Sequence, residues 1–361
     1  HSLPAWSPAG MNSRIRSLVG IQEIGLILVV ILLGGVLAGF GGKVRMVEFH
    51  KTSTGETQRV VVEKNKFLNA RNLTQLAKDT SFIAIMAVGA TFVIIAGGID
   101  LSVGATYALA SVLSALVFTK GEDRVLAGVL MCLGVGTLCG LLNGGMIVLL
   151  KVHPFIITLG TMAIYRGIAF VVTQGQSVGG FPEAFRQFVR RETADGLSLV
   201  PLIVMVFITA LGGTYLSRLA AGRRVYAVGG NELASRFSGI NVDRVKLSVF
   251  VISGLTAGIA ALLALGYYGS ASSGDGQGYE LNVIAAAVVG GASLSGGKGS
   301  ALGAFLGALI IQMISTGIVI LNINQNYSQI IIGAVVILAV LFDQLNNWLG
   351  KRRLAARAVN P

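Results

Sequence analysis

Asp100 and Arg166 are charged residues that lie among long apolar stretches of this chain. A charge at membrane depth is costly in lipid and by default faces a partner or a polar path. Asp100 belongs to the Gly-rich segment Gly97–Gly104 (GGIDLSVG), where it is expected to cap the free N–H groups of Ser102 or Val103. The alternative is a hinge or gate beside the paired glycines, because glycine accepts large changes in φ and ψ.

Arg166 has two possible roles. It either lies at a helix end, where it pairs with an acidic group or extends its guanidinium towards water, or it faces a polar path through the membrane. Neutral polar residues in other apolar stretches could line the same path, although hydrogen bonds between neighbouring helices are their favoured role. The candidates for a translocation path or gate are Gly98, Asp100, Ser102, Asn143, Thr158, Thr161, Arg166, Gln174 and Ser295.

Other chemistry finds little support in the sequence. The chain has three His, and His50 and His153 lack Cys or carboxylate partners at metal-ligand spacing. The segment Gly291–Ser300 is not a phosphate-binding loop, because Lys298 is followed by Gly299 rather than Ser or Thr. We therefore expect no catalytic residue, metal or cofactor on this chain.

The elements that position these residues are expected to be membrane helices. Hydrophobic residues make up 53% of the chain and charged residues 12%, which predicts an all-α polytopic membrane protein. The 49 Gly are expected mostly at close helix contacts, and Cys132 and Cys139 are too far apart on one helix to form a disulfide. Ten apolar stretches are predicted as spans, the eighth short enough for a half-helix: 24–41, 80–98, 102–119, 125–150, 154–173, 199–217, 247–266, 281–292, 299–321 and 328–348.

Ten spans place both termini on one side of the membrane. The basic segment Lys351–Arg357 (KRRLAAR) favours the cytoplasm for that side. We expect residues 1–23 and 350–361 to be cytoplasmic, residues 24–349 to form the membrane domain, and 218–246 to be a cytoplasmic loop. Residues 1–10 precede Met11 and are expected to be vector-derived, and no cleavable signal peptide is evident. The net charge of +12 fits a membrane surface, and no interleaved basic and aromatic face suggests nucleic acid.

The cytoplasmic loop contains a predicted helix of about two turns. Asn231 suits its N-cap, Glu232 suits the positive end of the helix dipole, and Gly239 suits a left-handed C-terminal turn. Leu233 and Phe237 are four residues apart and share one face. The helix either lies in the lipid headgroups or docks into a groove of a cytoplasmic partner.

An extracytoplasmic insertion, residues 43–66, follows the first span. Val44–Phe49 and Arg59–Glu63 flank Thr52–Glu56, which predicts a β-hairpin with a Gly-containing turn. We expect it either to contact a partner protein on the outer side of the membrane or to be exposed to solvent without a partner.

The frame Gly-Gly-x-x-Leu-Ser-x-Gly occurs twice, at Gly97–Gly104 and at Gly290–Gly297, 193 residues apart. In the predicted topology both frames fall at turns of the same orientation, which predicts a parallel internal repeat about an axis along the membrane normal. The alternative is a coincidence in a Gly-rich chain. Turns on opposite sides of the membrane would exclude the repeat.

Seven motifs resemble the permease subunits of bacterial ABC importers for monosaccharides, the ribose, xylose and galactose class. They occur in that family's order between Phe67 and Phe342. The motifs are 93–104 (VIIAGGIDLSVG), 142–145 (LNGG), 154–161 (PFIITLGT), 166–167 (RG), 226–232 (YAVGGNE), 238–240 (SGI) and 290–297 (GGASLSGG).

The resemblance implies an importer permease fold of the vitamin-B12-permease-like, type II kind. It also implies a second permease copy, a cytoplasmic tandem ATPase that binds ATP and Mg, and a periplasmic sugar-binding protein. Coupling to the ATPase would be the role of the predicted helix in the cytoplasmic loop, called here the surface helix. The sequence departs from the family pattern in two places: Ser235 stands where Ala is commoner in the family, and the 43–66 insertion is longer than expected. The implied coupling residues are Gly230, Asn231, Glu232, Leu233, Ala234, Phe237, Ser238 and Gly239.

Three alternatives to a monosaccharide importer stay open. Related permeases carry nucleosides or branched-chain amino acids. A secondary transporter driven by protons or sodium would need membrane-embedded Asp, Glu or His as a relay, of which this chain has almost none. A purely structural membrane subunit would give no uptake phenotype when deleted.

Overall fold

The structure, a computed structural model, describes residues 21–51, 57–193 and 196–359. The described residues form thirteen α-helices and two small antiparallel β-sheets. The helices are α1 (Ile21–Phe40), α2 (Ala70–Ile95), α3 (Val103–Phe118), α4 (Val125–Leu150), α5 (Pro154–Thr173), α6 (Glu183–Val189), α7 (Leu199–Arg218), α8 (Ala220–Gly230), α9 (Glu232–Phe237), α10 (Val242–Tyr268), α11 (Tyr279–Val289), α12 (Ala301–Ile320) and α13 (Ser328–Val359). The strands are β1 (Lys43–Lys51), β2 (Thr57–Asn65), β3 (Val178–Gly179) and β4 (Ser270–Ala271).

The ten predicted apolar stretches correspond to ten apolar helices, of which eight are long and apolar enough to cross a membrane within the described ranges. The other two are α3, with 16 residues, and α11, with 11 residues. At about 1.5 Å per residue they are roughly 24 and 16 Å long, against a hydrocarbon core of about 30 Å. The expectation of a half-helix near 281–292 is therefore confirmed, whereas the expectation of a full span at 102–119 is corrected.

Helix α2 lies at the centre of the bundle. Every residue from Thr80 to Ile95 is buried, and helices α7, α10, α11 and α12 pack around it. It begins ten residues before the predicted span and so includes Lys78, whose side chain is only 3% exposed. Lys78, which lies outside the predicted span 80–98, is therefore a second buried basic candidate within a membrane helix besides Arg166. The Lys78 ammonium lies 4.1 Å from the centre of the Tyr267 ring, a cation–π contact that compensates for burial.

Helices α4 and α10 are in contact through glycines. A Cβ atom on Gly140 would overlap the Phe250 carbonyl oxygen, and one on Gly254 would overlap the Gly136 carbonyl oxygen. These glycines let two helix backbones approach closely, as predicted for the Gly-rich stretches. Cys132 and Cys139 are buried free thiols on α4, so the prediction that they do not pair is confirmed.

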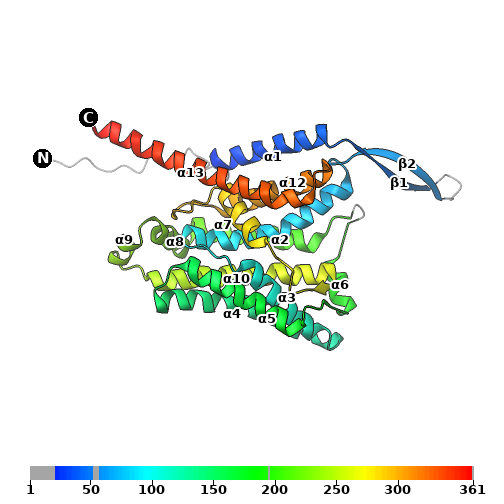
Figure 1. Cartoon of the computed structure of the whole chain (residues 1–361), viewed down its shortest axis with the longest axis horizontal. Coiled ribbons are helices and arrows are strands. Elements are labelled where there is room, and N and C mark those ends of the chain that lie inside the picture. Colours follow the sequence, from blue (N-terminus) through cyan, green and yellow to red (C-terminus); the bar gives the residue numbers. More distant parts are fainter. Residues whose placement is uncertain (1–20, 52–56, 194–195, 360–361) are drawn as a thin grey trace.

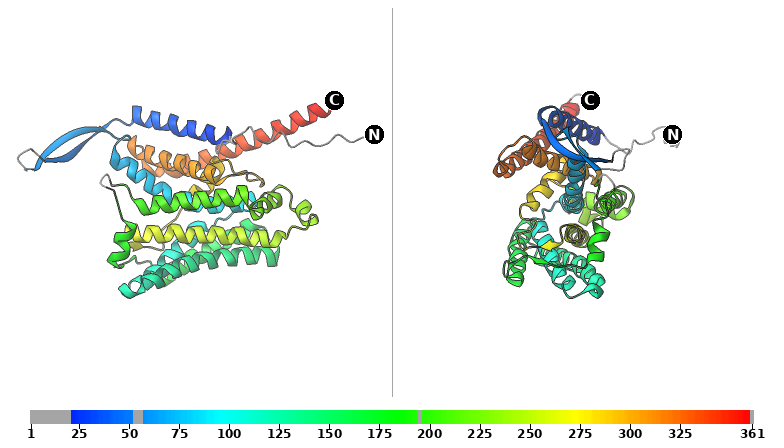
Figure 2. Two further views of the ribbon diagram at one scale, coloured as in Figure 1. Left: turned by 180° about the vertical axis from the view of Figure 1, so that it is seen from behind. Right: turned by 90° about the vertical axis from the view of Figure 1, so that its right-hand side faces the viewer.

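The predicted β-hairpin is present, with β1 and β2 antiparallel over nine pairs from Lys43 and Asn65 to Lys51 and Thr57. Its turn at 52–56 lies outside the described residues. Figure 1 shows that the hairpin projects from one end of the bundle, while α8, α9 and the C-terminal end of α13 lie at the opposite end. The reverse view in Figure 2 shows the same separation. The chain therefore has two distinct ends, which carry different accessory elements.

The two Gly-rich segments, residues 97–104 and 290–297, interrupt the helices and are called here the first and second breaks. They lie side by side at the end of the bundle nearer to α8. Gly97 and Gly291 both have positive φ, 82° and 96°, and each donates its N–H to the carbonyl three residues earlier. The Gly297 N–H reaches the Ile95 carbonyl over 2.8 Å, so the two turns are not at opposite ends. This geometry meets the condition set for a parallel repeat. By backbone conformation, Gly97 corresponds to Gly291, whereas the sequence frame aligns Gly97 with Gly290. The structural correspondence is therefore shifted by one residue from the sequence repeat.

Candidate functional site

Helix α9 forms as the local sequence predicts. The Asn231 side chain accepts the Ala234 N–H over 2.9 Å and caps the helix. Gly239 adopts φ of 80° after the last turn, and the Ile240 N–H returns to the Ser235 carbonyl over 3.0 Å. Both ends of this short helix are thus closed by hydrogen bonds that satisfy free backbone groups.

Leu233 and Phe237 on α9 are exposed by 65% and 84%. Apart from buried Ser235, every residue of α9 is exposed. Ser235, where the resemblance implies Ala, lies on the inward side of α9, so this difference leaves the outward face unchanged. An exposed Leu and Phe on one face of a rigid helix are typical of a site that a partner covers.

Ion pairs hold α9 against the start of α10. Lys246 donates to Glu232 over 2.8 Å, and Arg236 bridges Glu232 at 3.5 Å and Asp243 at 3.2 Å. The hydrogen bond from Lys246 lowers the pKa of Glu232, partial burial opposes the shift, and Arg236 adds to it. The partners Lys246 and Asp243 were not predicted from the sequence.

The lowered pKa of Glu232 predicts a pH-dependent contribution to the docking of α9. The contribution is complete above the ordinary pKa of 4.5 and is lost as the pH falls through the lower folded-state value. Because Glu232 is 46% exposed, it amounts to about 0.5–1 kcal/mol. At neutral pH, Glu232→Gln is expected to speed hydrogen–deuterium exchange of the α9 amides, and wild type and variant should converge once the pH has fallen below the lowered folded-state pKa of Glu232. A constant difference across this pH range would contradict the ion-pair account.

Helix α8, which sequence reasoning did not predict, joins α9 to the two breaks. A Cβ atom on Gly229 would overlap the Ile95 carbonyl oxygen at the end of α2. The Tyr226 hydroxyl donates to the Gly299 carbonyl over 2.7 Å, in the segment between α11 and α12. Gly-rich α8 has weak intrinsic helix propensity, and its contacts lie far away in sequence, which is why local signals missed it.

Asp100 is the centre of a buried hydrogen-bond network at the first break. Its Oδ1 accepts the Ser102 backbone N–H at 3.0 Å and the Ser102 hydroxyl at 2.6 Å, and its Oδ2 accepts the Ser253 hydroxyl at 2.8 Å. Asn143 donates to the Ser102 hydroxyl over 2.7 Å, and Tyr165 donates to Asn143 over 3.1 Å. The predicted cap of the Ser102 N–H is therefore confirmed, and the same carboxylate also ties the break to α10.

The predicted path residues divide into those near this network and those elsewhere. Thr158 bonds the Ile99 carbonyl over 3.1 Å, which fixes α5 to the break, while Thr161 bonds within α5. Gly98 is buried in the turn itself. Arg166 lies apart and donates to the carbonyls of Ser273 and Asp275.

Two further candidates lie on the surface of this chain. Gln174 is exposed and ends α5 with φ of 51°, and Ser295 is exposed in the second break. Neither reaches the Asp100 network. Two network members were missed from the sequence, Tyr165 and Ser253. Tyr165 follows Thr158 and Thr161 on one face of α5, at spacings of seven and four, and that pattern could have found it.

Removing the Asp100 carboxylate is expected to destabilise the helix bundle more than removing its charge. Asp100→Ala leaves the buried hydroxyls of Ser102 and Ser253 and one backbone N–H without their acceptor, at about 1–3 kcal/mol for each orphaned group. Asp100→Asn keeps an oxygen towards Ser102, so we expect it to lose less than half as much. Thermal unfolding in detergent measures both. Equal losses would indicate that the charge, not the hydrogen-bond network, stabilises the break.

The comparison with known proteins decides the family. The profile of a family described as "Branched-chain amino acid transport system / permease component" matches residues 72–340. The chain belongs to this permease family. The matched residues run from α2 into α13, so the two breaks, α8 and α9 all fall within the permease family region. No solved structure matches the permease sequence.

Curated relatives of the permease are subunits of importers. The ribose import permease protein of Haemophilus influenzae is 39% identical over 290 residues, 80% of this chain and 88% of that protein. The D-allose transport system permease protein of Escherichia coli is 38% identical over 279 residues, 77% and 85%. The autoinducer 2 import system permease protein of Escherichia coli is 33% identical over 301 residues, 80% and 90%. The resemblance inferred from the motifs is confirmed: the permease is a multi-pass protein of the bacterial inner membrane and not itself an enzyme.

Proposed function

We propose that this chain forms the translocation path for a monosaccharide in an ATP-driven importer. The observation that carries the proposal is α9: a capped, ion-paired helix presents Leu233 and Phe237 to the outside, at the end of the bundle where the two breaks meet. The similarity to ribose and allose permeases supports the substrate class. A neutral polyol also suits a path with few charged side chains.

A conformational change of the ATPase would be transmitted to the membrane helices through α8. The ATPase would bind Phe237 and its neighbours, and the ion pairs of Glu232 would make α9 move as a rigid body. Gly229 lies against the Ile95 carbonyl, and Tyr226 is bonded to Gly299, so a displacement of α8 would be transmitted to both breaks. The breaks, including Gly98, Asp100 and Ser102, would then act as the hinge that alternates access.

The assembly would contain a second permease copy, a tandem ATPase on the cytoplasmic side and a periplasmic sugar-binding protein. Both termini would be cytoplasmic. The end bearing α8 and α9 would then face the cytoplasm, and the hairpin end would face the periplasm (Figure 1). This arrangement is supported by the basic segment Lys351–Arg357 at the end of α13.

Deleting residues 51–57 tests the hairpin's contribution. If the hairpin contacts the binding protein, the shortened permease is expected to need several-fold more binding protein for half-maximal uptake, with an unchanged maximal rate at saturation. The measurement is uptake in proteoliposomes at a series of binding-protein concentrations. An unchanged concentration dependence would assign the hairpin to solvent and contradict the contact.

Reconstituted uptake tests the proposed function itself. The permease is inserted into vesicles with or without its ATPase, and labelled ribose, allose, a nucleoside and leucine are each offered with their binding proteins. We expect uptake of a monosaccharide only when both the ATPase and ATP are present. Uptake by the permease alone under a proton or sodium gradient would favour a secondary transporter, and uptake of leucine or the nucleoside would change the substrate class.

A further inference from the structure

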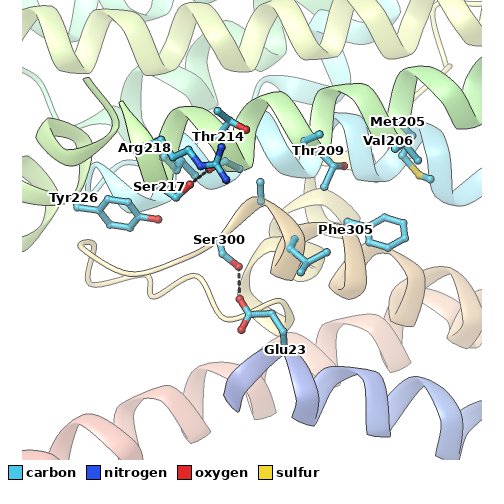
Figure 3. A pocket seen from close by; sticks show the side chains of 15 residues that line it. Glu23, Met205, Val206, Thr209, Thr214, Ser217, Arg218, Tyr226, Ser300 and Phe305 are labelled. Atoms are coloured by element: carbon cyan, nitrogen blue, oxygen red, sulfur yellow. Dashed lines mark hydrogen bonds between the residues drawn. The ribbon is translucent and has the colours of Figure 1, made fainter. Parts of the chain in front are cut away.

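A cavity of about 590 Å³ lies between α1, α7, α8 and α12, at the end of the bundle that carries α9. Figure 3 shows side chains from all four helices pointing towards it. Met205, Val206 and Phe305 line the part of the cavity that is farther from α8 (Figure 3). A cavity of this size and apolar lining suits a hydrocarbon ligand and is poorly suited to a sugar.

The helices beside the cavity expose apolar side chains that the bilayer would cover. On α1 the exposed residues include Ile24 and Leu28, and on α7 they include Ile203 and Phe207. Lipid is therefore the most abundant apolar molecule at the cavity's edge. The occupant that fits this position without any further partner is a membrane lipid.

The end of the cavity near α8 carries opposite charges on its two sides. Arg218 ends α7, and its guanidinium makes no ion pair within the part of the chain that the structure describes. Glu23 of α1 faces it across the cavity and accepts the Ser300 hydroxyl over 2.9 Å (Figure 3). A cation and an anion on facing walls match a zwitterionic headgroup, whose phosphate would meet Arg218 and whose ammonium would meet Glu23.

A hydroxyl between the charged and apolar parts strengthens the match. The Thr209 side-chain oxygen is buried and has no hydrogen-bond partner among the described residues. Buried polar groups are nearly always satisfied, so an orphaned hydroxyl at a cavity indicates a missing ligand or water. Figure 3 places Thr209 between Arg218 and the apolar pair Met205 and Val206, where its hydroxyl would donate a hydrogen bond to a fatty-acyl ester carbonyl.

We propose that this cavity binds one phospholipid with a phosphoethanolamine headgroup. Its phosphate pairs with Arg218, its primary ammonium donates to Glu23, and one acyl chain lies along Val206 and Phe305. A choline headgroup has no N–H to donate, and a glycerol headgroup has no cation, so both are weaker ligands. Ser300 and Tyr226 also border the cavity. The lipid would therefore lie beside the hydrogen bond from Tyr226 to the Gly299 carbonyl, which links α8 to the segment that follows the second break.

Native mass spectrometry of the full-length permease, titrated with lipids of identical acyl chains, tests the proposal. We expect phosphatidylethanolamine to bind at one site at least tenfold more tightly than phosphatidylcholine or phosphatidylglycerol. Glu23→Gln retains an acceptor for Ser300 and should therefore fold, yet it is expected to abolish the preference for ethanolamine over choline. Arg218→Gln should weaken the binding of all three lipids. The exposed control Lys151→Gln, at the residue that follows α4 at the same end of the bundle, should change the binding of none.

The same titration contains the results that would overturn the proposal. Equal affinity for the ethanolamine and choline lipids, or wild-type binding by Arg218→Gln, would exclude the headgroup assignment. Competition by soluble glycerophosphoethanolamine at equal concentration would show that no acyl chain is bound. Loss of the lipid from the assembled transporter, with the free permease still binding it, would mean that another protein surface fills the cavity in the working complex.

Discussion

Replacing Leu233 and Phe237 together by serine is expected to lower ATP-driven uptake at least tenfold. Both side chains are largely exposed, so the permease loses almost no internal packing and its thermal stability should stay unchanged. A partner that buries them would lose two apolar anchors, each worth about 1.5–3 kcal/mol. The measurement is copurification of the ATPase together with uptake in proteoliposomes.

A matched control uses exposed apolar residues at the other end of the bundle. Leu68 precedes α2, Phe188 lies in α6, and both are more than half exposed. The double variant Leu68→Ser/Phe188→Ser is expected to copurify with the ATPase as wild type does. If both pairs of substitutions weakened ATPase binding equally, or if the α9 pair had no effect, α9 would not be the coupling helix.

Gly229→Ala is expected to abolish most uptake and to lower thermal stability. The added Cβ atom would overlap the Ile95 carbonyl oxygen, so α8 would have to move away from the end of α2. Overpacking against backbone typically costs 1–3 kcal/mol, because backbone cannot rotate away as a side chain can. The displacement would also separate the surface helix from the breaks that it is proposed to move.

The adjacent residue supplies the control for this variant. A Cβ atom on Gly230 would meet no described atom within 4 Å, so Gly230→Ala is expected to keep the thermal stability of the wild type. Because Gly230 is itself one of the implied coupling residues, this variant is a control for stability and not for uptake. Thermal unfolding and uptake are measured for both variants. Equal thermal stability of the two variants would mean that the close contact of Gly229 with Ile95 does not stabilise the bundle, and wild-type uptake by Gly229→Ala would mean that this contact does not contribute to coupling.

Local signals made α9 and the hairpin predictable from the sequence. Asn231 and Gly239 bond to backbone groups within a few residues, so residue type and spacing are sufficient to place a cap and a left-handed turn. The alternating strands of the hairpin likewise depend on neighbours in sequence. Apolar length alone located the eight membrane-length helices, because the bilayer sets that length, whereas it overestimated α3, which is too short for a full span.

Features that depend on distant partners were not predictable. Lys78 was assigned outside a span because nothing near it in sequence indicates the Tyr267 ring on α10. Ser253 is an ordinary hydroxyl in an apolar stretch until α10 packs against Asp100. The one-residue shift of the repeat has a similar cause, since the position of positive φ follows from where α2 and α11 end rather than from the paired glycines.

Crosslinking from position 237 tests the central claim that energy enters this permease through α9. The native thiols of Cys132 and Cys139 are buried, so Phe237→Cys provides one exposed site for a thiol-reactive photocrosslinker in the assembled transporter. If energy enters through α9, we expect a crosslink from position 237 to the ATPase, and labelling by an impermeant maleimide only from the cytoplasmic face. A crosslink to the periplasmic binding protein, or labelling only from the outside, would contradict it.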